Sequence, residues 1–264
     1  MYPYIKIGNF TFWTFGITLS LSLILFFWML FKTTKKNGIN INFFILGFFG
    51  FFISTFIFAR LFYVIAQWRD FEFLLDEPLR SSIPKFLLTS DYSMSLMGGI
   101  IGFVLVLIIK IKKYHLNIEK YLDCIVLSFF FAAILGYFGA FLGGQIYGKP
   151  TTLPIGITYN SSDANIPFYG EVFPLAIIYS IVSFLIFVFL YMQRIITKAD
   201  GKVGYLGIFI FSIALFVLEF FNGDIDIFES FIKLDMNQLG AIILFLISFR
   251  GLKKVKKQNS TVSI

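Results

Sequence analysis

The sequence predicts an all-α integral membrane protein with seven transmembrane helices. Hydrophobic residues make up 58% of its 264 residues and charged residues only 14%, whereas a soluble domain averages roughly 45–50% apolar and about 25% charged residues. A soluble surface cannot be built from so little charge. In addition, the apolar residues gather in stretches near the length of about 20 residues that a helix needs to cross a bilayer, and the basic residues gather in alternate loops.

The third and seventh stretches are short, so the positions of their ends are the least well defined. The first stretch is expected to be a span and not a cleavable signal, because its apolar run is long and no basic cluster precedes it. The seven predicted spans lie near residues 12–31, 41–66, 93–110, 121–142, 172–192, 204–221 and 236–249.

The basic residues predict the orientation of these spans. Fifteen of the 22 Lys and Arg residues follow the first, third, fifth and seventh stretches, and six lie on the other side. The positive-inside rule then places the N-terminus outside and the basic tail, residues 250–264, in the cytoplasm. The net charge of +7 is therefore a signal of topology and of affinity for anionic lipid, and no nucleic-acid partner is expected.

The scarcity of two residue types limits the possible chemistry. The chain has one cysteine, Cys124, and one histidine, His115. An intrachain disulfide framework and a metal site built from several Cys or His side chains are excluded. No metal and no other cofactor is expected. Cys124 is interpreted as a packing residue, and His115 lies in an inner loop among lysines.

Two ionisable residues stand out inside predicted spans. Arg60 lies late in the second span and Glu219 near the end of the sixth. Such a group costs about 2.5–3.5 kcal/mol at the centre of a spanning helix, so it usually faces the bundle interior and finds a partner. We expect Arg60 and Glu219 to share one polar site, paired directly or through a lipid headgroup. The alternative is that each side chain reaches the interface separately.

Glycines form two clusters. The first covers Gly136 to Gly148 and contains two G-x-x-x-G spacings, and the second is Gly98-Gly99-Ile100-Ile101-Gly102. Small residues allow helix backbones to approach closely in lipid. Alternatively, backbone N–H groups of these glycines face a lipid phosphate, with Gln145 and Tyr147 nearby.

Two outer loops are long enough to carry structure of their own. Residues 67–92 alternate aromatic and charged side chains, a composition typical of an amphipathic segment that lies in the membrane interface. Residues 149–171 contain three prolines and predict either an ordered, turn-rich loop or a plain connector.

Five segments follow one another in a characteristic order: Arg60-Leu61-Phe62-Tyr63, Ser93 to Gly102, Gly136 to Gly148, Glu219-Phe220-Phe221 and Met236-Asn237-Gln238. This order resembles the prolipoprotein diacylglyceryl transferase family, bacterial enzymes that move diacylglycerol from phosphatidylglycerol to a lipobox cysteine. The resemblance runs over nearly the whole chain.

The departures from the family pattern fall on polar positions. Met97 and Phe173 stand where the family has histidines, and Gln145 stands where it has a glutamate. The family's arginines are replaced by Tyr137, Leu215 and Asn222, and two of its asparagines by Ala140 and Gly143.

The resemblance implies phosphatidylglycerol or another anionic phospholipid as one partner, a prolipoprotein signal segment as another, and the bacterial cytoplasmic membrane as the location. Glu219 would orient Arg60 or act as the catalytic base. Three functions stay open: an active transferase, a non-catalytic relative that binds phospholipid or a lipoprotein segment, and a small transporter. The residues that would bind the lipid headgroup are Arg60, Gly98, Gly99, Tyr137, Gly143, Gly144, Gln145, Tyr147 and Gln238.

Overall fold

The computed structural model describes residues 3–8, 10–71, 94–159, 170–197, 199–224 and 234–262. Its chain contacts divide into two compact units. Unit 1 comprises Met1–Ile39, Glu119–Asp224 and Ala241–Ile264, and unit 2 comprises Asn40–Ile118 and Ile225–Gly240. Each unit is built mainly from helices.

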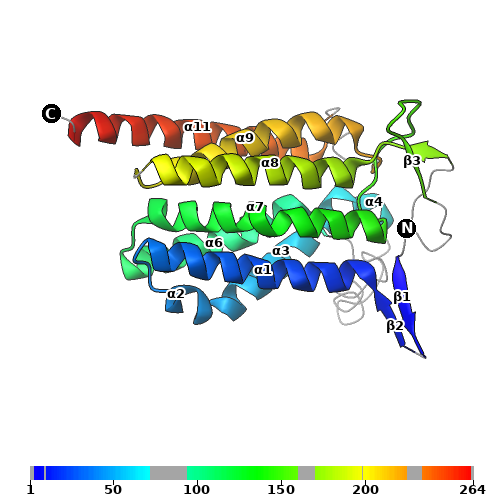
Figure 1. Cartoon of the computed structure of the whole chain (residues 1–264), viewed down its shortest axis with the longest axis horizontal. Helices are drawn as coiled ribbons and strands as arrows, with labels where there is room; N and C mark the ends of the chain where they lie inside the picture. The colour runs from blue at the N-terminus through cyan, green and yellow to red at the C-terminus, as the bar shows by residue number, and fades with distance from the viewer. Residues whose placement is uncertain are drawn as a thin grey trace. The chain divides into compact units, whose positions relative to one another are not determined.

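In unit 1, three long helices lie side by side: α1 (Thr14–Lys36), α7 (Ile118–Gly143) and α8 (Leu175–Ile196) (Figure 1). α9 (Lys202–Leu218) packs on α8 and ends in a 3₁₀ turn, η2 (Glu219–Phe221). α7 is the central helix of this row, and many of its side chains are buried. The row brings the C-terminal ends of α1 and α8 to the end of the unit where α7 begins.

In unit 2, α3 (Phe48–Ala66) packs along α6 (Leu96–Tyr114). Gly98 and Gly102 permit this approach, because a Cβ atom on either would collide with the α3 backbone at Phe58 or Ser54. The Ser54 hydroxyl donates a hydrogen bond of 2.9 Å to the carbonyl of Gly102. This is the close packing over small residues that is common between helices in membranes.

The second predicted span is divided into two helices. A short helix, α2 (Asn42–Ile45), precedes α3, and Gly47 stands at the N-cap of α3. The Asn40 side chain accepts a hydrogen bond of 2.9 Å from the backbone N–H of Asn42, which starts the short helix locally. After α3 comes α4 (Trp68–Phe71), which is the described part of the predicted amphipathic segment 67–92. Residues 72–93 lie outside the described residues.

Five described helices are long and apolar enough to cross a membrane, so the chain is a multi-pass helical membrane protein. These five are α1, α3, α7, α8 and α9 with η2. The third and seventh predicted spans correspond to α6 and to α11 (Met236–Val262). α6 carries three lysines in its last two turns, at positions 110, 112 and 113.

The helix α11 runs to Val262, whereas the sequence predicts its end near residue 249. Contacts within unit 1 explain the continuation through the basic tail. Val255 is buried, Gly251 leaves room for the ring of Tyr205, and Lys254 Nζ lies 2.8 Å from Glu119 Oε1. The tail is therefore packed onto unit 1 at least as far as Val255.

Two small antiparallel sheets accompany the helices. β1 (Tyr4–Ile7) pairs with β2 (Phe10–Trp13), and β3 (Ile157–Thr158) pairs with β4 (Glu171–Val172). Residues 4–13 are rich in aromatic and β-branched side chains around Gly8, which has a φ of +62°, and such a sequence favours a hairpin. Residues 160–169 of the predicted turn-rich loop lie outside the described residues.

Candidate functional site

Glu219 lies where α9 tightens into η2, and its side chain is buried, with the residue 7% exposed. Its Oε1 accepts a hydrogen bond of 2.6 Å from the hydroxyl of Tyr179 on α8. Its Oε2 accepts one of 2.9 Å from the side-chain amide of Asn222. Because a buried carboxylate without partners would be strongly unfavourable, these two donors explain how α9 can end in a buried acid.

A second tyrosine extends this cluster to α7. The ring of Tyr137 stacks on the ring of Tyr179, with 4.9 Å between centroids and an angle of 17° between planes. Three helices thus contribute to one site: Tyr137 from α7, Tyr179 from α8 and Glu219 from the end of α9. The site offers a carboxylate and two phenols in a buried setting, which suits proton transfer or orientation of a polar substrate group.

The segment after α7 closes the same end of unit 1. Gly144 takes a φ of +66°, and the N–H of Gln145 then donates to the carbonyl of Ala140 at 2.9 Å, an arrangement typical of a glycine helix end. The Tyr147 hydroxyl donates a hydrogen bond of 2.6 Å to Asp224 Oδ1. Tyr147 therefore ties the signature segment to the residues that follow Glu219.

Backbone hydrogen bonds reinforce this closure. The N–H of Gly148 donates to the carbonyl of Phe173 at 3.0 Å, and the N–H of Lys149 donates to that of Phe221 at 2.8 Å. The rings of Phe173 and Phe221 stack with centroids 4.5 Å apart. Three segments that are far apart in sequence, near residues 148, 173 and 221, are consequently joined beside Glu219.

The glycines of α7 pack against α1. A Cβ atom on Gly139 would overlap the side chain of Thr18, and one on Gly143 would come within 2.8 Å of Phe15 Cβ. In the same interface the Ser22 hydroxyl donates 2.6 Å to the carbonyl of Ala132. These contacts favour the close-packing interpretation of the glycine cluster, and contact of Gly143 or Gly144 with a lipid headgroup stays a prediction.

Arg60 belongs to unit 2 and is 2% exposed. Its guanidinium carbon lies 5.3 Å from the ring centroid of Tyr63 and 5.4 Å from that of Phe71 in α4. Cation–π contacts of this kind stabilise a charged group away from water. Because Arg60 and Glu219 belong to different units, their pairing stays a prediction.

The remaining predicted residues of unit 2 have structural partners. Gln238 and Asp235 cap the start of α11 reciprocally: the N–H of Gln238 donates 2.6 Å to Asp235 Oδ1, and the N–H of Asp235 donates 3.1 Å to Gln238 Oε1. A Cβ atom added to Gly99 would meet the side chains of Thr55 and Ala59 at ordinary van der Waals distances. Met97, which stands at the family's histidine position, is buried, and Gly240 leaves room for its thioether.

A buried acid of α7 escaped the sequence reasoning, although its position inside the predicted span 121–142 was a usable signal. Asp123 is 2% exposed and accepts hydrogen bonds from the N–H groups of Gly201 at 2.9 Å and Gly204 at 2.6 Å. It also lies 3.2 Å from Arg194 Nη1. Asp123 therefore fixes the start of α9 to α7 and α8, at the opposite end of these helices from Glu219.

Two further observations concern metals and thiols. Among the described residues, no group of three or more His, Cys, Asp and Glu side chains is arranged to hold a metal ion. Cys124 is buried, and its sulfur accepts a hydrogen bond of 2.9 Å from the side-chain amide of Asn37.

The helices and the buried carboxylate cluster define the protein as a multi-pass helical membrane protein with a polar site at one end of unit 1. The sequence profile of the prolipoprotein diacylglyceryl transferase family matches residues 3–252. The chain therefore belongs to this family, and the resemblance seen in its motifs is confirmed.

Curated relatives agree with this assignment. A phosphatidylglycerol–prolipoprotein diacylglyceryl transferase of Clostridium tetani is 29% identical over 214 residues, which are 80% of this chain and 80% of that protein. One of Wolbachia pipientis subsp. Culex pipiens is 27% identical over 249 residues, covering 92% of this chain and 90% of that protein.

Proposed function

We propose that this protein transfers the diacylglyceryl group of phosphatidylglycerol to the cysteine thiol of a prolipoprotein signal segment. The observation that carries the proposal is membership of the transferase family over residues 3–252. The buried cluster of Glu219, Tyr179 and Tyr137 supports it, because it places a carboxylate and two hydroxyls beside the family's signature segment.

The proposed reaction exchanges one bond for another at a glycerol carbon. The cysteine sulfur attacks the carbon that carries the phosphate, and the S–C bond forms as the C–O bond breaks. The phosphate oxygen keeps the bonding electron pair, and glycerol phosphate leaves. The thiol must lose its proton, because thiolate is the nucleophile. Glu219 is the proposed acceptor of this proton, and the hydroxyl of Tyr179 positions its carboxylate.

Arg60 is the proposed contact for the phosphate. A guanidinium offers two parallel donors to phosphate oxygens, and such donors stabilise the negative charge that develops on the leaving group. Tyr63 and Phe71 support Arg60 from the side through their ring faces.

The proposed setting is the bacterial cytoplasmic membrane, with seven spans, the N-terminus outside and the C-terminus in the cytoplasm. The five helices that are long and apolar enough support five of these spans. α6 and α11 would supply the other two. The lysines at the end of α6 and in the second half of α11 support the orientation, because basic residues favour the cytoplasmic side.

A transfer assay tests the proposal. Purified protein in micelles that contain phosphatidylglycerol is mixed with a lipobox peptide, and mass spectrometry follows the diacylglyceryl thioether. Glu219→Gln should lower the rate at least about a hundredfold, the usual range for loss of a general base. Arg60→Ala should do the same through loss of charge stabilisation. Matched controls are Glu171→Gln and Arg250→Ala, which alter exposed residues.

One observation favours a second candidate, a relative that binds lipid without catalysis. Met97 stands at the family's histidine position, and it is buried and packed against Gly240, so that position offers neither a base nor a cation. The same assay separates the candidates. Absence of thioether, with phosphatidylglycerol still bound in an Arg60-dependent manner, would establish the non-catalytic function and contradict the transferase.

A further inference from the structure

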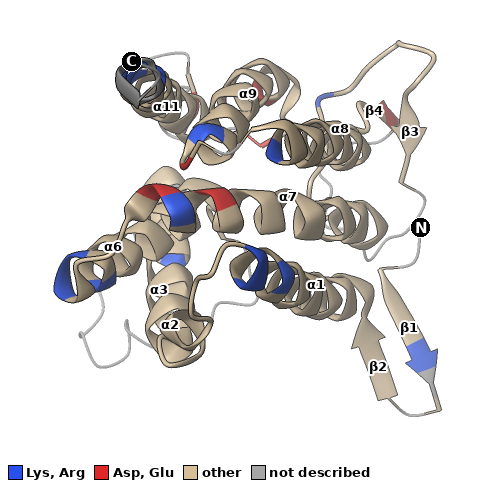
Figure 2. Ribbon diagram, turned by 60° about the vertical axis from the view of Figure 1, so that its left-hand side comes forward, with Lys and Arg blue, Asp and Glu red and all other residues tan. Residues whose placement is uncertain are grey.

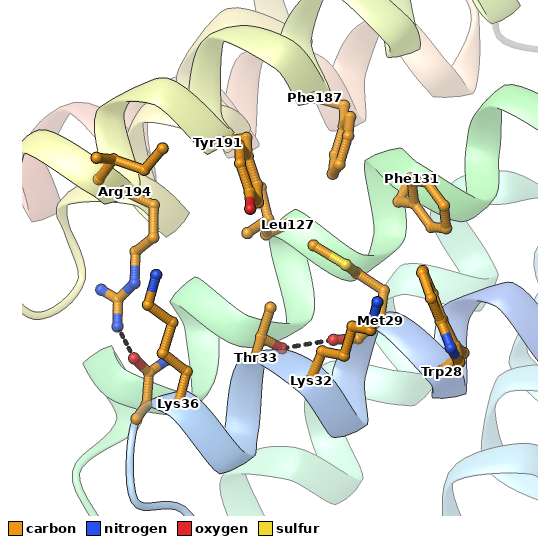
Figure 3. Close-up of a pocket in the computed structure, with 12 residues that line it drawn as sticks. Trp28, Met29, Lys32, Thr33, Lys36, Leu127, Phe131, Phe187, Tyr191 and Arg194 are labelled. Carbon is orange, nitrogen blue, oxygen red and sulfur yellow. Dashed lines mark hydrogen bonds between the residues drawn. The ribbon is translucent and has the colours of Figure 1, made fainter.

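A groove lies on unit 1 at the end away from Glu219. It has a volume of about 380 Å³ and lies over α7, between the C-terminal halves of α1 and α8 (Figure 3). Along α8, Tyr191 in the groove is twelve residues from Tyr179 in the Glu219 cluster, which is about 18 Å at the rise of a helix. The groove is therefore separate from the proposed catalytic cluster.

One half of the groove is aromatic. Trp28 of α1 stacks on Phe131 of α7 with 5.7 Å between centroids. Phe131 lies 5.1 Å from Phe187 of α8, which lies 5.9 Å from Tyr191. These rings and Leu127 form a continuous apolar surface across the three helices (Figure 3). Trp28 and Tyr191 are exposed at this surface of unit 1, so the rings offer an apolar face on which an acyl chain can pack.

The other half of the groove is cationic. Trp28, Lys32 and Lys36 recur at intervals of four residues, so they share one face of α1. Lys32 Nζ lies 3.6 Å from the ring centroid of Trp28, and Lys36 extends toward Arg194 of α8 (Figure 3). Figure 2 shows the basic residues of α1, blue on the ribbon, at the C-terminal end of that helix.

The cations differ in how far their charge is neutralised. Arg194 forms an ion pair with Asp123, at 3.2 Å, and donates a hydrogen bond to the side chain of Asn37. Neither Lys32 nor Lys36 forms an ion pair with a carboxylate in the described part of the chain. The lining contains no Asp or Glu side chain. Two lysines with uncompensated charge thus remain above an aromatic surface.

We propose that this groove binds one anionic phospholipid, with its phosphate at Lys32, Lys36 and Arg194 and an acyl chain along Trp28, Phe131 and Phe187. The apolar rings match the acyl chain of such a lipid, and the cations near the helix ends match its phosphate. Hydrogen bonds from Lys and Arg cations to phosphate oxygens are roughly twice as strong as those between neutral groups. With the proposed orientation, the lipid belongs to the cytoplasmic leaflet and is not the transfer substrate.

Trp28 provides a direct probe. The chain has three tryptophans, so Trp13→Phe/Trp68→Phe leaves Trp28 as the only one. This variant is reconstituted in phosphatidylcholine vesicles that contain either brominated phosphatidylglycerol or brominated phosphatidylcholine at the same fraction. Bromine on the acyl chain quenches nearby indole fluorescence. We expect the anionic lipid to quench Trp28 more strongly, and equal quenching by the two lipids would overturn the proposal.

Paired variants identify the groove. Lys32→Ala/Lys36→Ala removes two of the three proposed phosphate contacts and should lower the preference for the anionic lipid at least about tenfold, because each contact is a hydrogen bond between charged groups. Lys32→Arg/Lys36→Arg should keep the preference. The matched control is Lys35→Ala/Lys253→Ala, which removes the same charge from exposed positions outside the lining. An equal loss in the control pair would mean general surface attraction and would contradict a defined site.

A last arm separates lipid from free anion. Inorganic phosphate is added to the vesicles with brominated phosphatidylglycerol, against chloride at equal ionic strength. Quenching that persists supports the lipid. Recovery of fluorescence with phosphate alone would show that a soluble anion occupies the cations, and it would overturn the lipid assignment. None of these measurements uses transfer activity, so their result is independent of the proposed reaction.

Discussion

The hydroxyl of Tyr179 lies 2.6 Å from Glu219 Oε1, and this hydrogen bond joins α8 to the end of α9 inside the buried cluster of unit 1. Asn222 holds the other carboxylate oxygen. The carboxylate is thereby fixed in orientation by two donors from separate segments. We expect this orientation of the Glu219 carboxylate to matter for catalysis.

Tyr179→Phe should lower the rate of diacylglyceryl transfer about tenfold, because a buried acceptor that loses its partner costs about 1–3 kcal/mol. The initial rate with the lipobox peptide measures the effect. If Tyr179 only supported the fold, thermal stability would fall while kcat stayed constant. Tyr114→Phe, at an exposed position on α6, should leave the rate unchanged.

The glycine contact between α7 and α1 is expected to be tight. Gly139→Ala should destabilise the protein by about 1–3 kcal/mol, because the added methyl group overlaps Thr18 in a closely packed interface. Thermal unfolding in detergent measures the shift. The matched control is Gly16→Ala on α1, where nothing lies within 4 Å of the added Cβ. A loss at Gly16 as large as at Gly139 would contradict the packing explanation.

Gln238 can be tested as a helix cap against its predicted contact with a lipid headgroup. Gln238→Glu preserves the reciprocal cap with Asp235, since glutamate at this position also reaches back to the cap N–H. Because Gln238 is buried beside the Asp235 carboxylate, the added negative charge should nevertheless lower the thermal stability. Gln238→Ala, which loses the cap contact without adding a charge, should lower it by about 1 kcal/mol. The negative charge of Gln238→Glu would repel a phosphate, so weaker phosphatidylglycerol binding in that variant would instead support the headgroup contact.

We expect the contribution of Asp123 and Arg194 to stability to depend on both residues being present. Arg194→Met leaves Asp123 buried beside the start of α9 without its cation, and breaking such a pair costs about 3–5 kcal/mol. Asp123→Asn/Arg194→Met should be less destabilised than the sum of the single variants. Additive losses, measured by thermal unfolding, would show that the two residues act independently.

The tail contact predicts a pH dependence. The hydrogen bond from Lys254 to Glu119 raises the pKa of Lys254 above its ordinary value of 10.5. Because this pKa is higher in the folded state, the contribution is complete below pH 10.5 and is lost as the pH rises through the folded-state pKa. The Lys254 side chain is 60% exposed, so the effect is small, below about 1 kcal/mol.

The measurement is the difference in Tm between the natural protein and Lys254→Met, from pH 8 to pH 11. It should shrink at the alkaline end, whereas Lys253→Met should show no such trend. A difference that stays constant across this range would exclude the ion pair as its source.

The sequence by itself determined the class of the protein and its family. Hydropathy is a local property, summed over neighbouring residues. Each range predicted from apolar side chains therefore overlaps a long helix in the structure. Family membership follows from the order of motifs, which is also written along the chain. The end of α11 was beyond this reasoning, because Gly251 packs against Tyr205 of α9 and Lys254 pairs with Glu119 of α7, and local composition does not encode these contacts.

Only the tertiary structure decided which partners surround the polar residues. Glu219 and Tyr179 are 40 residues apart, and nothing in either local sequence states that the end of α9 meets α8 at that tyrosine. The same holds for Gly139 against Thr18 and for the aromatic and cationic groove over α7. Such contacts depend on which faces of packed helices meet. Which faces meet is decided by the shapes of the helices and by how closely they can approach across the whole unit. In lipid, burial of apolar surface does not favour one face over another, because lipid tails are as apolar as the side chains.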